Sequence, residues 1–344
     1  MVNFPITIVF RDGETAQVTC RDFETVVQAA ERQNLRLLVD CREGACGTCK
    51  GTLQSGQFSL DDYSEEALPE AERLEGRVLT CQMRPQSPCV VEFDYPMSAI
   101  RRGPAPVARR ASVVDIMPLT DEVIEVTLQS EDKRPFNFLP GQYANLQIPE
   151  TSTIRSYSFV NRPGSDSASF LVRLIQNGLM SQWLKRQSPS PTSLLVTGPL
   201  GRFFLRDPGR PLLFVAGGTG IGPIISILDT IRNAGVAPPC VTLVFGVNSS
   251  AGVFHRHTLE ALIEGFSAGK LVITAMSPDP AWDGATGTAV DALDALEIVR
   301  DAHAYVCGPP AMVERAQMAL TLRGLDKRSI FAEIFLPTAD TRTA

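Results

Sequence analysis

Four cysteines near the start of the chain constrain its fold more than any other feature. Cys41, Cys46 and Cys49 have the spacing C-x4-C-x2-C, and Cys81 follows further along. Two glycines stand within the first three, where a tight loop needs residues that tolerate unusual backbone angles. Four thiolates in this pattern are the ligands of a [2Fe–2S] cluster, and amides turned toward the sulfurs stabilise its reduced form. The sequence therefore predicts a [2Fe–2S] cluster held by these four cysteines.

A structural zinc site and disulfide bonds are the alternatives for these cysteines. Zinc prefers two separated C-x2-C pairs, and the second pair is missing here. The chain of 344 residues has eight cysteines. Because it shows no secretory signal, we expect reduced thiols and a cytoplasmic location. Cys20 and Cys89 lie in strand-like segments and are expected to be small, buried apolar residues.

The negative charge of the chain is concentrated in its first part. Residues 1–96 carry 9 basic and 16 acidic side chains, a net of −7, whereas the rest of the chain has a net of +1. An acidic surface disfavours nucleic acid and could attract a basic protein partner. A merely solvated face is the alternative. The acidic residues gather at Asp61, Asp62, Glu65, Glu66, Glu70, Glu72 and Glu75.

The segments around the cysteines indicate a small mixed domain. Two β-rich runs, 5–10 and 15–20, are separated by a turn and predict a hairpin. Residues 23–33 have helical spacing, with Thr25 as a candidate cap. The cysteine loop, an acidic helical segment and a strand at 89–93 follow. This order resembles the β-grasp fold of plant-type [2Fe–2S] ferredoxins, which we assign to residues 1–97, followed by an exposed linker at 98–109.

The middle of the chain, residues 110–207, has short alternating strands that predict an antiparallel β-barrel. It resembles the six-stranded flavin domain of the ferredoxin-NADP⁺ reductase superfamily, on an R-x-Y-S motif and a later G-x-x-S motif. An arginine can pair with a pyrophosphate, a tyrosine can pack on the flavin, and a serine can reach flavin N5. A glycine turn that opens a helix offers amides to phosphate. The flavin residues implied are Arg155, Ser156, Tyr157 and Ser158, with Gly178, Leu179, Met180 and Ser181 at the phosphate.

Residues 208–344 alternate buried strands and helices, which predicts a parallel nucleotide-binding sheet. The first strand, 212–216, runs into a glycine-rich turn before a helix, an arrangement that brings amides close to a pyrophosphate. The turn departs from G-x-G-x-x-G and instead resembles the G-G-T-G-x-x-P of the same superfamily; a purely structural turn is the alternative. The residues expected to bind the nucleotide here are Gly217, Gly218, Thr219, Gly220 and Pro223.

Two last motifs complete the resemblance to the reductase superfamily. Cys307, Gly308 and Pro309 begin a C-G-P-P turn at a strand end, where open α/β sheets bind ligands. Glu333 and Phe335 resemble the family's E-x-F, whose aromatic ring lies near the flavin. The resemblance implies that Cys307 lies beside the nicotinamide. It also assigns the hydride-transfer site to Cys307, Ser158 and Glu333.

The choice of coenzyme depends on the segment after the second strand of this sheet, 241–245. NADPH binding normally requires a cation there for the 2′-phosphate. The segment that follows contains Asn248 and serines, which can bind ribose hydroxyls, and the nearest cation is Arg256. We therefore expect NADH to be preferred.

Over the whole chain, the order ferredoxin, flavin, nicotinamide is similar to reductase components of ring-hydroxylating dioxygenases, of the benzoate dioxygenase reductase type. The resemblance implies that NADH reduces FAD and that the [2Fe–2S] cluster passes single electrons to a terminal oxygenase, Rieske-type or di-iron. A reductase of a di-iron monooxygenase is the alternative, and an iron–sulfur sensor or docking module is a second. We expect the oxygenase to dock near the acidic ferredoxin domain, a monomeric chain, and neither nucleic acid nor membrane as partner.

Overall fold

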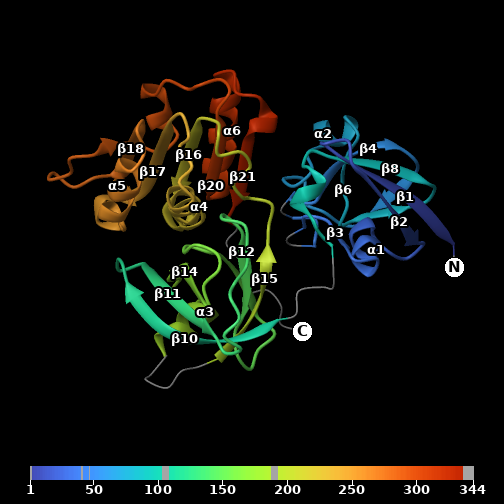
Figure 1. The fold of residues 1–344 in the computed structure, drawn as a ribbon, viewed down its shortest axis with the longest axis horizontal. Helices are drawn as coiled ribbons and strands as arrows, with labels where there is room; N and C mark the ends of the chain where they lie inside the picture. The colour runs from blue at the N-terminus through green and yellow to red at the C-terminus, as the bar shows by residue number, and fades with distance from the viewer. Residues whose placement is uncertain (1, 40–41, 46, 103–107, 187–192, 336–344) are drawn as a thin grey trace. The chain divides into compact units, whose positions relative to one another are not determined.

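The computed structural model describes residues 2–39, 42–45, 47–102, 108–186 and 193–335 (Figure 1). The chain divides into two compact units. One comprises Met1–Val107 with Leu200–Arg202, and the other comprises Ala108–Pro199 with Phe203–Ala344. Each unit is described here by itself.

The first unit is built on a five-stranded mixed sheet in the order β2-β1-β8-β4-β6. The expected hairpin is confirmed, and β1 also pairs in parallel with β8. The expected helix is confirmed as α1, where Thr25 and Gln28 form a reciprocal capping box. A sheet of this order with one helix packed on it is the predicted β-grasp fold. Its elements are β1 (Asn3–Phe10), β2 (Thr15–Arg21), α1 (Val26–Arg32), β4 (Lys50–Ser55), α2 (Glu70–Leu74), β6 (Arg77–Leu79) and β8 (Cys89–Phe93).

Two short ladders complete this unit. Strand β5 (Phe58–Leu60) pairs with β7 (Met83–Pro85). Strand β3 (Leu35–Arg36) pairs with β9 (Arg101–Arg102), after the 3-10 turn η1 (Met97–Ala99). The start of the segment expected to be an exposed linker therefore pairs with the ferredoxin domain. Residues 103–107 of that segment lie outside the described residues.

The second unit begins with the expected six-stranded antiparallel barrel, in the order β13-β12-β15-β10-β11-β14. An isolated bridge between Phe159 and Phe170 joins the two ends of this order, so the sheet closes on itself. Inside, the rings of Phe138 and Phe159 stack at 3.9 Å between centroids. The elements are β10 (Arg109–Pro118), β11 (Val123–Ser130), β12 (Tyr143–Gln147), β13 (Ile154–Ser158), β14 (Ser167–Arg173), α3 (Leu179–Lys185) and β15 (Ser193–Leu200).

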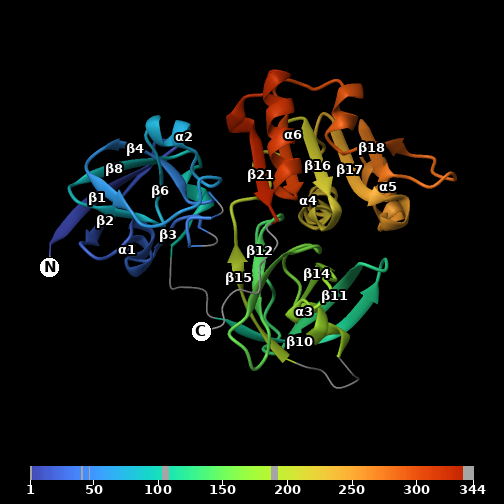
Figure 2. The same ribbon diagram turned by 180° about the vertical axis from the view of Figure 1, so that it is seen from behind.

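The rest of this unit is a parallel six-stranded sheet in the order β19-β18-β17-β16-β20-β21. The order reverses between β16 and β20, which creates the switch point where such sheets bind ligands. Helix α6 lies against β20 and β21 (Figure 2). The strands are β16 (Leu212–Gly217), β17 (Val241–Ser249), β18 (Gly269–Ser277), β19 (Ala285–Thr286), β20 (His303–Gly308) and β21 (Ile330–Ile334). The helices are α4 (Ile221–Asn233), α5 (Arg256–Glu264) and α6 (Pro310–Leu322), with 3-10 turns η2 (Gly218–Gly220), η3 (Ser250–Gly252), η4 (Asp291–Ala295) and η5 (Lys327–Ser329).

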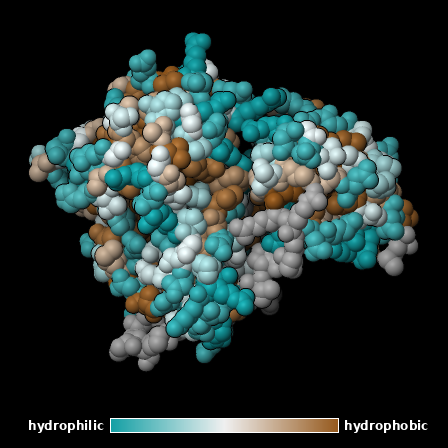
Figure 3. Space-filling model, in the orientation of Figure 1, coloured by the Kyte–Doolittle hydropathy of each residue, from teal (hydrophilic) through white to brown (hydrophobic). Residues whose placement is uncertain are grey.

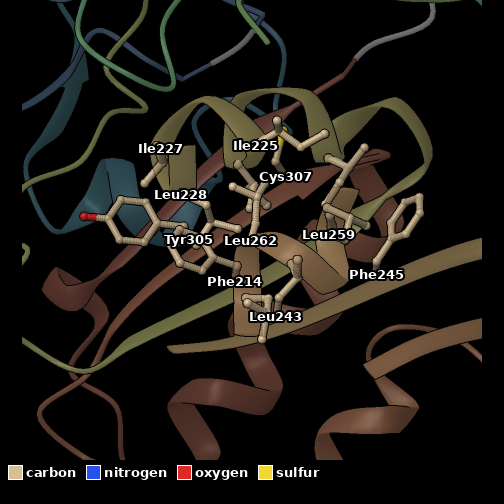
Figure 4. Close-up of a cluster of buried hydrophobic side chains, with 14 of the residues drawn as sticks. Phe214, Ile225, Ile227, Leu228, Leu243, Phe245, Leu259, Leu262, Tyr305 and Cys307 are labelled. Carbon is tan, nitrogen blue, oxygen red and sulfur yellow. The ribbon is translucent and has the colours of Figure 1, made fainter. Parts of the chain in front are cut away.

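Helices cover both faces of this sheet. Alternate residues of β16 point to opposite sides: Phe214 packs with α4 and α5, whereas Val215 packs with α6. Figure 4 shows the first of these clusters, in which Phe214, Leu243 and Tyr305 lie among side chains of α4 and α5. Burial on both faces explains why the strands are almost continuously apolar in sequence.

Polar contacts join the barrel to the nucleotide-binding sheet. Ser226 Oγ in α4 donates to the carbonyl oxygen of Asn161 at 2.8 Å. Nearby, Arg162 Nε lies 2.9 Å from Asp229 Oδ2. The second unit is therefore held by specific contacts as well as by a shared apolar core.

The visible face of the molecule is predominantly hydrophilic, with apolar side chains in small scattered patches (Figure 3). No helix among the described residues is long and apolar enough to cross a membrane.

Candidate functional site

Two of the four predicted cluster ligands lie side by side in the first unit. Cys49 and Cys81 are 1% and 6% exposed and form no disulfide. The amide and the hydroxyl of Thr80 both donate to the carbonyl oxygen of Cys49, at 3.2 and 2.8 Å. These bonds hold the two ligand segments together. Cys41 and Cys46 lie outside the described residues.

The loop around these thiols fits a cluster. Gly44 and Gly47 have φ of +71° and +70°, which only glycine adopts without strain. A Cβ on Gly44 would lie 2.7 Å from Cβ of Tyr63, so the loop also has no room for a side chain there. Gln82 Nε2 donates to Cys81 Sγ at 3.6 Å, the kind of hydrogen bond that tunes a cluster's potential. Thiol donors in an apolar pocket match a [2Fe–2S] group.

The predicted flavin motif occupies β13, next to β12. Tyr157 packs against the barrel core, and its burial raises the pKa of its hydroxyl, so the phenol is neutral at physiological pH. Ser158 is 7% exposed. Ser156 donates instead to Asn145 Oδ1 at 2.7 Å, so this hydroxyl tethers the two strands. A cation, a ring and a buried hydroxyl thus lie along one strand, and their contact with FAD stays a prediction.

The G-x-x-S motif opens helix α3 as expected. Gly178 is the N-cap, and no side chain caps the helix start. Ser181 is 4% exposed, and its Oγ accepts a hydrogen bond from the amide of Ile175 at 2.9 Å. The serine hydroxyl therefore closes the turn before the helix and is engaged by the backbone of that turn.

The two nucleotide motifs interlock at the switch point. Ala216, the residue before the glycine-rich turn, pairs with Cys307 in the neighbouring strand. A Cβ on Gly220 would lie 2.4 Å from the carbonyl oxygen of Cys307. A Cβ on Gly217 would lie 2.6 Å from Met312 Sδ. The close approach of the C-G-P-P turn thus requires glycine at positions 217 and 220, and the binding of a nucleotide by this turn stays a prediction.

The three residues assigned to hydride transfer come together. Ser158 Oγ donates to Glu333 Oε2 at 3.2 Å, across 175 residues of sequence. Glu333 pairs with Cys307 in the register of β20 and β21. Burial, and then the charge of Glu333, raise the pKa of the Cys307 thiol well above its usual value. Phe335 follows the strand, and its amide donates to the carbonyl oxygen of Gly308 at 2.9 Å.

The residues expected near the coenzyme ribose lie at the end of β17. Asn248 is exposed there. Arg256 turns toward Trp282, with its guanidinium carbon 5.0 Å from the ring centroid, and Nη2 lies 3.4 Å from Asp283 Oδ1. Asp279, which belongs to no sequence motif, hydrogen-bonds to Ser250 just after the same strand end.

Three known domain families match successive segments of the chain. The 2Fe-2S iron-sulfur cluster binding domain matches residues 9–86. The oxidoreductase FAD-binding domain matches residues 111–205, and the oxidoreductase NAD-binding domain matches residues 214–318.

Similarity to known proteins extends over nearly the whole chain. The toluate 1,2-dioxygenase electron transfer component of Pseudomonas putida is 36% identical, over 96% of this chain and 98% of that protein. The phenol hydroxylase P5 protein of Acinetobacter pittii is 31% identical, over 95% and 93%. The structure of the cytochrome P450 reductase GcoB of Amycolatopsis, 28% identical, has a TM-score of 0.75 over 97% of this chain and 99% of that one. The chain therefore belongs to the family of oxygenase reductase components, typified by those of ring-hydroxylating dioxygenases, which are NADH-dependent oxidoreductases with FAD and a [2Fe–2S] cluster.

Proposed function

We propose that this chain supplies electrons to a ring-hydroxylating dioxygenase and that the oxygenase docks on the acidic face of the ferredoxin domain. Support for the dioxygenase comes from the 36% identity to the toluate dioxygenase component, against 31% to the phenol hydroxylase protein. The phenol hydroxylase relative keeps a di-iron monooxygenase as the second candidate partner.

The residues proposed to bind FAD are those of β13 and of the start of α3. Arg155 would pair with the pyrophosphate, Tyr157 would cover the flavin, and the amides of Leu179 and Met180 would contact phosphate. FAD, when bound, takes two electrons from NADH and releases them one at a time. Ser158 holds its proton on Oγ, directed at Glu333.

NADH is proposed to lie across the switch point of the parallel sheet. The glycine-rich turn after β16 would approach the pyrophosphate, and the Cys307 turn would adjoin the nicotinamide. Because its pKa is raised, the Cys307 thiol is neutral and serves as a small apolar contact that excludes water. Glu333 supplies the negative charge beside it.

The proposed docking surface is the acidic surface, defined as the carboxylates of residues 61–75. Three of its seven members are paired: Asp61 with Arg84, Glu70 with Arg73, and Glu72 with Lys50, each at 2.6 Å. The other four have no ion-pair partner among the described residues: Asp62, Glu65, Glu66 and Glu75. These unpaired charges would supply the attraction for a basic partner.

Ionic strength separates the docking step from the internal steps. The Debye length falls from about 10 Å at 0.1 M salt to about 3 Å at 1 M, so reduction of the oxygenase should slow as salt rises. NADH reduction of FAD within this chain should change little over the same range. Equal salt sensitivity of the two rates would contradict the docking proposal.

A matched pair of variants locates the docking surface. Glu65→Lys should slow oxygenase reduction, because it reverses an unpaired charge of the acidic surface. Glu14→Lys makes the same change in the exposed turn between β1 and β2 and should leave the rate unchanged. Both should reduce ferricyanide with NADH at the wild-type rate. Equal slowing by both variants would show that net charge alone, and not this surface, governs docking.

We further propose a monomeric chain in the cytoplasm. The six cysteines among the described residues form no disulfide bond, as expected in a reducing compartment. A mass in analytical ultracentrifugation of twice the 37.4 kDa of the chain would contradict the monomeric state.

A further inference from the structure

The loops after β17 and β18 lie together at the carboxyl edge of the parallel sheet. Ser249, the last residue of β17, pairs with Ser277, the last residue of β18. In sheets of this type the adenosine ribose contacts the end of the strand that follows the first helix. Here that strand is β17, which comes after the glycine-rich turn and α4. The two loops therefore border the place of the ribose.

One carboxylate is fixed at this place. Ser250 Oγ donates to Asp279 Oδ2 at 2.5 Å, and the amide of Asp279 donates back to Ser250 Oγ at 3.1 Å. The amide of Ala281 donates to the other oxygen, Oδ1, at 2.9 Å. A carboxylate offers about four acceptor positions, so Asp279 can still accept hydrogen bonds from ribose hydroxyls. Its side chain lies in an exposed loop and is open to a ligand.

The cation of the same region is engaged elsewhere. Arg256 lies over Trp282, 3.4 Å from Asp283 Oδ1 and 4.0 Å from Glu260 Oε1. A 2′-phosphate brought to this edge would meet the Asp279 carboxylate and would have to draw Arg256 away from two acids. The negative charges of the phosphate and of the Asp279 carboxylate would repel each other, and salt would screen this repulsion.

We propose that Asp279, held by Ser250, is the residue that makes this chain discriminate against 2′-phosphorylated nicotinamide coenzymes. The carboxylate accepts from the ribose hydroxyls of NADH and repels the additional phosphate of NADPH. The inference rests on the nucleotide-binding role of this domain and assigns the coenzyme preference to a specific residue. Selectivity comes from a placed negative charge as well as from a lack of positive charge in the loop after β17.

The test measures binding without electron transfer. Isothermal titration calorimetry of the holoenzyme with ADP-ribose and with 2′-phospho-ADP-ribose gives two dissociation constants, whose ratio reports the effect of the 2′-phosphate alone. Asp279→Asn should shift this ratio by about tenfold or more toward the phosphorylated ligand, which corresponds to about 1.4 kcal/mol. An unchanged ratio overturns the proposal.

A matched control separates local charge from net charge. Asp301 lies just before β20, at the opposite edge of the same sheet, and Asp301→Asn removes the same charge. This variant should keep the wild-type ratio, and an equal shift in it would overturn the proposal. Salt provides a second readout. Raising the salt concentration from 0.1 to 0.5 M should bring the ratio of the two dissociation constants closer to one, and the change should be larger in the wild type than in Asp279→Asn.

The same preparations keep the proposal distinct from the function of the chain. NADH reduction of ferricyanide, measured on each variant, reports the reductase itself. Normal ferricyanide reduction with an unchanged binding ratio would overturn the role of Asp279 and leave the reductase assignment intact. Ser250→Ala keeps the charge of Asp279 but removes the hydrogen bond that holds its carboxylate. A ratio of dissociation constants between those of the wild type and Asp279→Asn would support the positioning role of Ser250.

Discussion

Replacing Gly220 by alanine tests whether the contact between the glycine-rich turn and the Cys307 turn sets the geometry of hydride transfer. The new Cβ would lie 2.4 Å from the carbonyl oxygen and 2.7 Å from the carbonyl carbon of Cys307. Ordinary contacts begin at 3.4 Å, so the backbone must yield by about 1 Å. Neither partner is a flexible side chain, and the displacement therefore moves one turn away from the other.

A displacement of about 1 Å at the reacting centre can cost about 100-fold in rate, or about 2.7 kcal/mol. We expect Gly220→Ala to slow the anaerobic bleaching of FAD by saturating NADH by about this factor in stopped-flow measurements. FAD content and the cluster spectrum should be retained, because the change lies outside both sites. A wild-type bleaching rate in a variant with normal FAD content would refute the reasoning.

Two neighbouring glycines provide graded controls. A Cβ on Gly222 would lie 3.4 Å from Val160 Cγ2, at the limit of ordinary contact, so Gly222→Ala should bleach at close to the wild-type rate. A Cβ on Gly217 would meet Met312 Sδ at 2.6 Å, but that side chain is flexible. The bleaching rate of Gly217→Ala should therefore lie between those of Gly220→Ala and Gly222→Ala. This variant remains informative if Gly220→Ala fails to fold.

Three further predictions concern the cysteines and one buried ion pair. Cys81→Ser should lose the cluster spectrum yet keep NADH-to-ferricyanide activity, since FAD reduces ferricyanide directly; loss of both would mean that the domains do not function separately. Arg32→Met should lower the free energy of unfolding of the ferredoxin domain by about 2 kcal/mol in urea titrations, because it leaves the Glu24 carboxylate, 9% exposed, without its two 2.7 Å hydrogen bonds. Arg32 lowers the pKa of Glu24, so this stabilisation is fully present above the ordinary pKa of 4.5 and is lost as pH falls through the lower folded value; an unchanged urea midpoint at pH 7 would contradict it. Native alkylation with iodoacetamide at pH 8, followed by mass spectrometry, should label the half-buried Cys240 before Cys307, whose pKa is raised the more strongly by burial; the opposite order would show that the sheet opens at the switch point.

The fold was predictable wherever local signals were strong. The hairpin of β1 and β2, the capped helix α1 and the buried strands from β16 onward each had a period or a cap that the sequence displays. Strands β3 and β9 were not predictable, because two-residue strands have no period. The segment of Glu333 shows only a motif in the sequence, whereas in the structure it forms the edge strand β21.

The candidate site was predictable as a set of residues but not as an arrangement. Motifs identified Ser158 and Glu333 separately, and their contact depends on how β21 packs against the barrel. Ser181 has the residue type expected at a phosphate, but its hydroxyl is engaged by the amide of Ile175. Asp279 carries no motif at all. Its position follows from the pairing of β17 with β18, a long-range feature that single-sequence patterns do not encode.

The role of Cys307 follows from its neighbours on both sides. Gly220 approaches its carbonyl oxygen, Glu333 stands opposite it in the next strand, and the whole residue is buried in the apolar core. A thiolate there would be disfavoured twice, first by burial and then by the charge of Glu333. A nucleophile requires the opposite environment, with a nearby cation and solvent access. The environment of Cys307 is therefore suited to packing rather than to covalent chemistry, as its proposed contact with the nicotinamide requires, and Ser158 donates a hydrogen bond to the Glu333 carboxylate.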